Sequence, residues 1–380
     1  MAGKAKVKPT WSVDPLPAQA ATSYINSVDI SRDGQRVICG TYYYDYNPVS
    51  NHTPVASTFP VGVFCYNAKG KLQWSDKFTA SEGVYWVAMS QDASWAASGG
   101  LLSHGNGFIR AYNAATGTMA LNFTTNARVN RVALSADGAY LVAGASATYF
   151  FSRNGAAWSA PQVIPSAAGD YVVAVDISDD GQWIAAGTHN GFISLIRNVG
   201  GALSPAITWQ QPSGSIYWVE MAAGGSGFVA GAKNASLMFF STAGFTGAAG
   251  PTWTKKLTGC TRCGSVGISA DGSLVSAVGN AGKTGKVFLF QNQNSTAKSL
   301  WSATTLHNPN STSLDAAGQY VTVADGQPDG TPGAFYLYDG AGNLKWSYGT
   351  SNMSWPMQVS EDATGIAAGS DDASVYYFAV

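Results

Sequence analysis

Charged residues are scarce in this sequence of 380 residues. Only 11% of them are Asp, Glu, Lys or Arg, and 21 basic residues stand against 22 acidic ones, which leaves a net charge of −1. A typical soluble domain has about a quarter of its residues charged. Binding of a phosphate backbone requires an excess of Lys and Arg, so this balance predicts that nucleic acid is not a partner.

Long apolar segments are also missing. No run approaches the roughly 18 apolar residues of a transmembrane helix, so we do not expect the chain to span a membrane. Residues 1–8 are basic but no apolar stretch follows them, so they do not form a signal peptide. Low Lys and Glu content and Asn-x-Ser/Thr triplets, such as those at Asn51 and Asn122, nevertheless favour export. We therefore expect a periplasmic or extracellular protein whose signal peptide has been removed.

Cysteine is rare, with four residues in the chain. Cys39 and Cys65 lie in strand-like segments, where we expect them to act as small core residues. Cys260 and Cys263 form a Cys-x-x-Cys motif, which is a weak zinc signal without a second such pair or a nearby His pair. We predict a small loop disulfide between Cys260 and Cys263, with two free thiols as the alternative.

Apolar and turn-forming residues are abundant and are organised in a repeat. Hydrophobic residues make up 46% of the chain, which also contains 44 glycines. The segment Val175–Gly187 has relatives throughout the sequence, and the copies follow one another at intervals of 43 to 47 residues, except for a first interval of 59. In each copy one position, usually Asp, marks a turn; these positions are Asp33, Asp92, Asp137, Asp180, Gly224, Asp271, Ala317 and Asp362.

Each copy predicts four short strands. Apolar residues alternate along the first strand, as at Val175 and Ile177, and a turn of the Ser-x-Asp-Gly type follows. A second and a third strand come next, and the fourth strand carries a Trp in six copies: Trp74, Trp158, Trp209, Trp253, Trp301 and Trp346. Four strands in a repeat of about 45 residues are typical of a β-propeller blade.

The sequence therefore predicts an all-β fold, a single eight-bladed β-propeller of four-stranded antiparallel blades over residues 1–380. The last copy lacks a fourth strand, whereas the N-terminal segment Pro9–Val13 resembles the fourth strands of other copies. We expect this segment to complete the last blade and close the ring, which removes an open sheet edge. The expected blades cover residues 22–80, 84–125, 129–165, 171–211, 215–258, 263–305, 309–349, and 353–380 plus 8–14.

These repeats resemble those of WD-repeat and quinoprotein-like (PQQ-like) propellers, and the Trp-bearing outer strands are most similar to the latter. They are also similar to the non-catalytic propeller of the bacterial outer-membrane β-barrel assembly machinery. The resemblance implies blades rather than a particular chemistry, because this fold hosts many functions. The adjacent cysteine pair of quinoprotein dehydrogenases is absent from this chain, so the resemblance does not imply that family's cofactor.

Two rows of inner-strand positions are expected to face the central channel. One row contains three carboxylates, and the other contains aromatic residues and an arginine nearer the top face. We use top face for the face that holds the loops between blades and between second and third strands. Such a funnel suits a sugar, a cationic ligand or a hard metal ion, and the alternative is a wet channel in which polar residues cost little. The candidate ligand-binding residues are Trp86, Arg131, Trp218, Trp355, Tyr85, Tyr217, Asp29, Asp176 and Glu220.

A long top-face loop of the first blade, Thr41–Pro60, is rich in tyrosine. Tyrosine combines a large apolar ring with a hydroxyl group, which suits recognition of proteins or carbohydrates. The candidate recognition residues are Tyr42, Tyr43, Tyr44 and Tyr46. The alternative is that the loop folds over neighbouring blades and buries its own rings.

Motifs for catalysis are missing, including a Gly-x-Ser-x-Gly elbow and a phosphate-binding glycine loop. We favour a non-enzymatic binding or scaffold propeller whose top face and funnel recognise a protein or carbohydrate ligand. One alternative is an enzyme that acts on a carbohydrate or uses a bound metal ion or quinone, and another is a structural component of an envelope or surface assembly. No cofactor and no metal site are predicted; no two of the four histidines have metal-ligand spacing.

Overall fold

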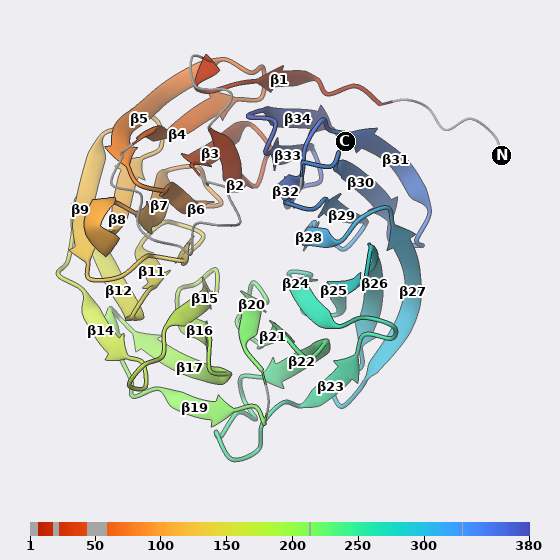
Figure 1. Cartoon of the computed structure of the whole chain (residues 1–380). Helices are drawn as coiled ribbons and strands as arrows, with labels where there is room; N and C mark the ends of the chain where they lie inside the picture. The colour runs from red at the N-terminus through yellow and green to blue at the C-terminus, as the bar shows by residue number, and fades with distance from the viewer. Residues whose placement is uncertain (1–6, 18–22, 44–58, 213, 329) are drawn as a thin grey trace.

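Antiparallel strands build the protein, which is described by a computed structural model over residues 7–17, 23–43, 59–212, 214–328 and 330–380. Groups of strands follow one another around a central channel (Figure 1). A short 3-10 helix, η2 (Ser103–Gly105), lies between β7 (Trp95–Leu101) and β8 (Gly107–Asn113). The prediction of an all-β propeller is confirmed.

The strands form seven hydrogen-bonded sheets within the described ranges. The largest sheet has eight strands, and its two halves are joined through the single residue pair Tyr42–Gly83 between β3 and β6. Divided at this pair, the described strands make eight groups, which we call blades 1 to 8 in chain order. In blades 3 and 4 the outer strand is split in two, so each of these sheets has five strands.

The strands of the first four blades have the following bounds. Blade 1 contains β2 (Tyr24–Ile30), β3 (Arg36–Tyr42), β4 (Phe59–Asn67) and β5 (Leu72–Ala80), and blade 2 contains β6 (Gly83–Met89), β7, β8 and β9 (Met119–Thr125). Blade 3 contains β10 (Arg131–Leu134), β11 (Tyr140–Gly144), β12 (Ala147–Asn154), β13 (Ala157–Trp158) and β14 (Gln162–Pro165). Blade 4 contains β15 (Val172–Ile177), β16 (Trp183–Thr188), β17 (Phe192–Val199), β18 (Ala202–Leu203) and β19 (Ile207–Gln210).

The strands of the last four blades complete the ring. Blade 5 contains β20 (Ile216–Met221), β21 (Gly227–Ala232), β22 (Ser236–Ser241) and β23 (Trp253–Lys256), and blade 6 contains β24 (Arg262–Ile268), β25 (Leu274–Ala281), β26 (Thr284–Asn292) and β27 (Ala297–Thr305). Blade 7 contains β28 (Pro309–Leu314), β29 (Tyr320–Asp325), β30 (Ala334–Asp339) and β31 (Leu344–Gly349). Blade 8 contains β32 (Ser354–Val359), β33 (Gly365–Ser370), β34 (Val375–Ala379) and β1 (Trp11–Val13).

The N-terminal strand closes the ring by pairing with the C-terminal one. Strand β1 is antiparallel to β34, with Trp11 opposite Tyr377, and the two rings stack with centroids 5.6 Å apart. The indole N–H of Trp11 also donates to the carbonyl of Ala68 in blade 1, at 3.0 Å. The predicted completion of the last blade by the N-terminal segment is confirmed (Figure 1).

The Ser-x-Asp-Gly turns have the local structure that their residues favour. In blade 4, the Ser178 hydroxyl donates to Asp180 Oδ1 at 2.7 Å, and that oxygen also accepts the N–H of Gln182 at 2.9 Å. The N–H of Trp183 donates back to Ser178 Oγ at 3.0 Å, and Gly181 adopts a φ of 69°. Asp and Ser therefore satisfy the backbone of the turn, and Gly supplies the left-handed conformation. We call the face that carries these turns the turn face.

A closed circle of backbone hydrogen bonds connects these turns around the channel. In six blades, the residue at the x position donates its N–H to the carbonyl of the x residue of the next blade; in blades 2 and 8 the following Asp is the donor. The bonds, of 2.9 to 3.2 Å, run Arg32 to Gln91, Asp92 to Ala136, Ala136 to Asp179, Asp179 to Ala223, Ala223 to Ala270, Ala270 to Ala316, Ala316 to Glu361, and Asp362 to Arg32.

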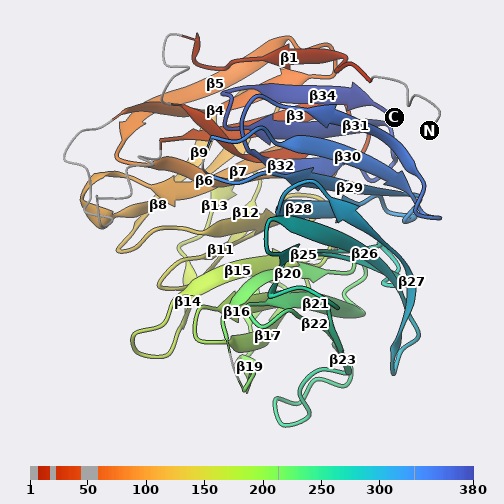
Figure 2. The same ribbon diagram turned by 45° about the vertical axis from the view of Figure 1, so that its right-hand side comes forward.

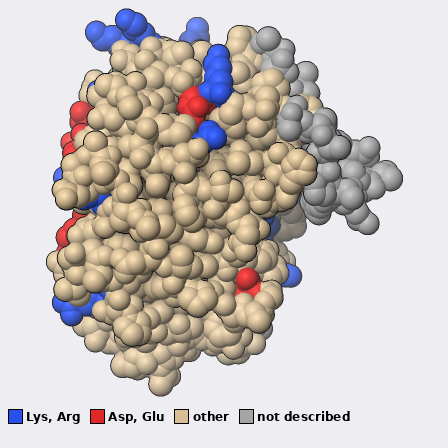
Figure 3. Space-filling model, turned by 90° about the vertical axis from the view of Figure 1, so that its left-hand side faces the viewer, with Lys and Arg blue, Asp and Glu red and all other residues tan. Residues whose placement is uncertain are grey.

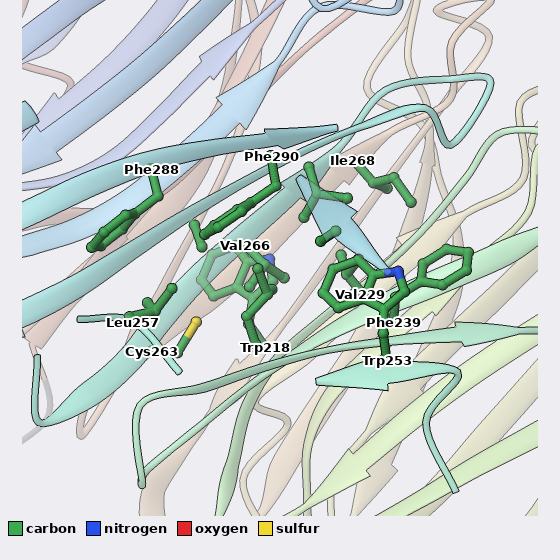
Figure 4. Packing of buried hydrophobic residues seen from close by; sticks show 14 of the residues in the cluster. Trp218, Val229, Phe239, Trp253, Leu257, Cys263, Val266, Ile268, Phe288 and Phe290 are labelled. Carbon is green, nitrogen blue, oxygen red and sulfur yellow. The ribbon is translucent and has the colours of Figure 1, made fainter. Parts of the chain in front are cut away.

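Apolar side chains fill the spaces between neighbouring blades. In the cluster between blades 5 and 6, Trp218 and Phe239 from one blade meet Val266 and Phe288 from the next (Figure 4). Seen from another direction, the blades follow one another as successive layers (Figure 2). Each sheet therefore buries both faces, and the outer wall near β9 and β14 displays few charged side chains (Figure 3). This packing gives the low charge content of the sequence a structural cause.

Contact between a turn glycine and the preceding blade leads to a stability prediction. A Cβ atom added to Gly181 would lie 2.2 Å from Tyr140 of blade 3, at a φ of +69°. We expect Gly181→Ala to lower the free energy of unfolding by about 2–5 kcal/mol, through the left-handed backbone and the overpacking together. The matched control is Gly155→Ala, where φ is +59° but nothing lies within 4 Å of the added atom, and where we expect about 1 kcal/mol. Thermal and urea unfolding measure both, and equal losses would contradict the packing argument.

Candidate functional site in the central channel and on the top face

The inner strands enclose a cavity on the axis of the ring. Its volume is about 220 Å³, and it is lined by the predicted carboxylates Asp29, Asp176 and Glu220 and by Arg131 and Trp86. The predicted inward direction of the three carboxylates is correct. Each of them is half-buried because part of its surface faces this cavity inside the ring.

The three carboxylates also connect neighbouring blades. Asp29 Oδ2 accepts the N–H of Met89 at 2.8 Å, and Asp176 Oδ2 accepts that of Met221 at 2.7 Å. Glu220 Oε1 accepts the N–H of Ile268 at 3.3 Å. In each case the donor belongs to the inner strand of the next blade. The carboxylates therefore stabilise three blade interfaces, in addition to any role toward a ligand.

Trp86, Arg131 and Trp218 meet across the channel on the top-face side of the carboxylates. The guanidinium carbon of Arg131 lies 4.4 Å from the ring centroid of Trp86 and 3.8 Å from that of Trp218. The two indoles pack edge to face, 5.2 Å apart. Arg131 is 8% exposed and Trp218 is 6% exposed. Trp86 is half-buried. Cation–π contacts thus hold a largely buried stack of residues from blades 2, 3 and 5 where the sequence predicts an aromatic mouth.

Burial shifts the titration of this site toward neutral pH. Loss of solvation raises the pKa of Asp29 to about 7, that of Asp176 to about 6 and that of Glu220 to about 8. The charge of Arg131 and the backbone N–H donors act in the opposite direction. Burial also lowers the pKa of Arg131. The site therefore combines one buried cation with carboxylic acids that exchange protons near physiological pH.

A second polar group, which the sequence predictions missed, spans the channel at the turn face. Arg32 donates from Nη2 to Glu361 Oε2 at 2.7 Å and also to Gln91. Gln91 in turn donates to Asp179 Oδ1 at 2.7 Å. These four residues all occupy the x position of the Ser-x-Asp-Gly turn, where blades 3, 5, 6 and 7 have Ala. Alignment of the repeats could therefore have predicted this cluster, because four copies have a polar residue at a position where the other four have Ala.

Tyr85, Tyr217 and Trp355 lie outside the largely buried stack and are half-buried on the top face. The hydroxyl of Tyr85 accepts a hydrogen bond from Arg128 Nη1 at 3.0 Å, and the guanidinium carbon of Arg128 lies 4.4 Å from the Tyr85 ring centroid. The guanidinium carbon of Arg262 lies 5.9 Å from the centroid of Tyr217. Tyr85 and Tyr217 therefore each lie beside an arginine on this face. Ligand binding by the nine candidate residues stays a prediction.

The tyrosine loop is only partly described. Tyr42 is 7% exposed and its ring lies 6.1 Å from that of Tyr85, so it packs inside the protein instead of forming a recognition surface. Tyr43 is half-buried and stacks on Phe59, with centroids 3.5 Å apart. Tyr44 and Tyr46 lie outside the described residues. For Tyr42, the alternative that the loop buries its own rings is the better interpretation.

The predicted disulfide between Cys260 and Cys263 is wrong, because both residues are free thiols. Cys263 is fully buried on β24 and faces blade 5, where its sulfur would lie 3.0 Å from a Cβ added to Gly231. The sulfur of Cys260 instead approaches Gly279 of β25, 2.8 Å from a Cβ added there. The side chain of Cys263, within β24, and that of Cys260, which precedes this strand, thus approach different neighbours.

Within residues 7–17, 23–43, 59–212, 214–328 and 330–380, His, Cys, Asp and Glu do not gather in any group of three or more that could hold a metal ion. The same part of the chain contains no helix with the length and apolar character needed to cross a membrane.

Comparison with known proteins finds a family whose repeat is similar to one segment of this chain. The sequence profile of the WD domain, G-beta repeat family matches residues 162–196. This segment runs from β14 of blade 3 to β17 of blade 4, so the sequence repeat is displaced from the blade by one strand. The same offset of one strand between sequence repeat and blade places the N-terminal strand β1 at the outer edge of blade 8. A comparison with curated proteins found no match to the chain.

Two solved structures are similar to this chain in fold. The structure of Chaetomium thermophilum Sqt1 bound to the N-terminus of ribosomal protein L10 has a TM-score of 0.70 at 13% identity, and the match covers 94% of this chain and 97% of that one. The β-propeller domain of Myceliophteria thermophila Cps50 (Swd1) has a TM-score of 0.59 at 12% identity, with 77% of this chain and 95% of that one covered. The likeness is one of fold.

The raised carboxyl pKa values lead to a prediction about pH. A carboxyl group whose pKa is higher in the folded than in the unfolded state binds more protons when folded, so stability falls as the pH rises between the two pKa values. For Glu220 this window extends from about 4.5 to about 8. We expect Glu220→Gln, which keeps an acceptor for Ile268, to lose less stability than the wild type between these pH values, by about 1 kcal/mol or more.

Thermal unfolding of both proteins across this pH range is the measurement. If the melting temperatures of the two proteins fell by the same amount as the pH rises, Glu220 would not titrate in this window. That result would contradict the assignment of a raised pKa.

Proposed function

We propose that the protein, a WD-repeat-type propeller, is a non-enzymatic binding scaffold that recognises a protein partner through its top face. Its own side chains cross the channel. The observation that carries this proposal is the stack of Trp86, Arg131 and Trp218. Arg131 and Trp218 are buried, and the guanidinium of Arg131 lies over the rings of Trp86 and Trp218, so these rings are engaged within the protein and the recognition groups are sought around them.

The half-buried residues of the top face support a protein partner. Arg128 and Glu82 have side chains that are 41% and 33% exposed, and they surround Tyr85. Trp355 of blade 8 is also half-buried. Aromatic and arginine side chains are the residue types that contribute most to protein interfaces. The Sqt1 structure, in which a propeller holds the N-terminus of a ribosomal protein, offers a precedent for the mode of binding and not for the partner.

Other functions are less well supported. Carbohydrate recognition would also use exposed aromatic residues, and it remains the second candidate on account of Tyr217 and Trp355. An enzyme in the funnel would need an accessible site, whereas the carboxylates there accept hydrogen bonds from backbone N–H groups of the next blade. A role in an envelope or surface assembly is one form of the scaffold proposal. We propose export to the periplasm or cell exterior on composition alone, since the free thiols remove one of its supports.

The test compares two faces of the ring. The double variant Arg128→Ala, Trp355→Ala alters the top face, and the control Lys69→Ala, Arg197→Ala alters exposed residues near the turn face. Each immobilised protein is exposed to an extract of the cells that produce it, and captured proteins are quantified by mass spectrometry. We expect a partner captured by the wild type to fall about tenfold with the top-face variant, a loss of roughly 1.4 kcal/mol, and to be unchanged with the control.

Two results would contradict the proposal. One is that no protein is enriched by the wild type above bare resin, and the other is an equal loss of the partner with both variants. If a glycan array is bound by the wild type while the extract yields no protein, carbohydrate recognition replaces protein recognition.

A further inference from the structure

The charges of this nearly neutral chain are unevenly distributed. Between residues 221 and 314, which make up most of blades 5 and 6 and the start of blade 7, there are seven Lys or Arg and one acidic residue, Asp271. The whole chain has 21 basic and 22 acidic residues. One sector of the ring is therefore strongly basic, and the rest is correspondingly acidic.

Five of these seven cations lie at the top-face ends of blades 5 and 6. Their positions are the turn after β21, the end of β23, the start of β24, the turn after β25 and the start of β26. We call them the basic patch: Lys233, Lys256, Arg262, Lys283 and Lys286.

Hydrogen bonds connect the loops that carry the basic patch. Lys256 Nζ donates to the carbonyl of Asn234, next to Lys233, at 2.5 Å. Lys286 Nζ of blade 6 donates to the carbonyl of Thr258, which follows β23 of blade 5, at 3.0 Å. The patch therefore continues across the interface between the two blades.

No carboxylate neutralises the patch among the residues that the structure describes. The described residues form four ion pairs, and none of them includes a residue of the basic patch: Arg32–Asp179, Arg32–Glu361, Arg110–Asp76 and Arg128–Glu82. Asp271 belongs to the turn after β24 on the opposite face. Lys233, Lys256 and Lys283 are exposed, and the buried Nε of Arg262 has no hydrogen-bond partner. The patch thus offers exposed positive charge on the face proposed for recognition.

We propose that the basic patch binds an acidic segment of the partner protein, rich in Asp and Glu. This inference rests on the proposed function and names the chemistry and the sector of the top face involved. Carboxylates supply the charge that the patch lacks, and Tyr217 beside Arg262 offers an aromatic ring at the inner border. Complementary charge of this kind increases the rate of association and selects the partner.

A protein segment suits the patch better than a nucleic acid does. The patch is confined to two blades of a ring whose net charge is −1. Outside this sector acidic residues outnumber basic ones, so an extended phosphate backbone would be repelled on either side of it. A short acidic peptide needs only a few cations in one place.

A defined peptide tests the proposal independently of the natural partner. The probe is a fluorescein-labelled peptide of ten consecutive glutamates, and its binding is followed by anisotropy at low and at high salt. The patch variant is Lys233→Gln, Lys256→Gln, Lys283→Gln. The matched control is Lys69→Gln, Lys255→Gln, Lys298→Gln, which removes the same charge from outer strands and from the turn face.

We expect saturable, salt-sensitive binding by the wild type, weakened about tenfold in the patch variant and unchanged in the control. No binding by the wild type, or equal weakening in both variants, would overturn the proposal. Tighter binding of a ten-nucleotide single-stranded DNA than of the peptide would overturn it in favour of nucleic acid. Because Arg128 and Trp355 are intact in these variants, failure here leaves the capture test of the proposed function unaffected.

Discussion

Contacts between neighbouring blades determine both the stability and the shape of this protein. The backbone circle at the turn face passes through every blade, and its last bond, from Asp362 to Arg32, joins blade 8 to blade 1. Side-chain contacts between the inner strands add to this backbone circle: Asp29 and Asp176 each accept an N–H group from the next blade. A ring built in this way has no separate central core, and each sheet is stabilised on both faces by its neighbours.

The same constraint governs the chemistry of the channel. Inner-strand side chains converge on the axis, where a guanidinium between two indoles and a hydrogen-bonded cluster around Arg32 occupy the two ends. The carboxylates between these ends are largely withdrawn from solvent, which is the reason that their pKa values are raised. The proposed recognition of a protein partner therefore involves the surface, where the top face combines aromatic residues with exposed positive charge.

Several features of the site were accessible from the repeat, and others were not. Alignment of the copies placed Asp176 and Arg131 on the channel side, because alternation along a strand decides which face a residue occupies. It did not reveal that Trp86 and Trp218 would pack edge to face, since blades 2 and 5 are far apart in the sequence and meet only across the axis. The Cys-x-x-Cys motif was misleading for a similar reason: Cys263 lies on β24 and faces blade 5, whereas Cys260 precedes that strand and approaches Gly279 of β25.

The sequence by itself determined the repeat, the four strands of each copy, the turns and the strand that closes the ring. These features depend on local patterns, such as two-residue alternation and the hydrogen bonding of Ser, Asp and Gly, and on the offset between the two ends of the chain. Only the tertiary structure decided which inward-facing residues meet, which tyrosines are buried and which of the basic residues lie on the same face. Those outcomes depend on distances between residues from different blades, and a one-dimensional pattern carries no information about such distances.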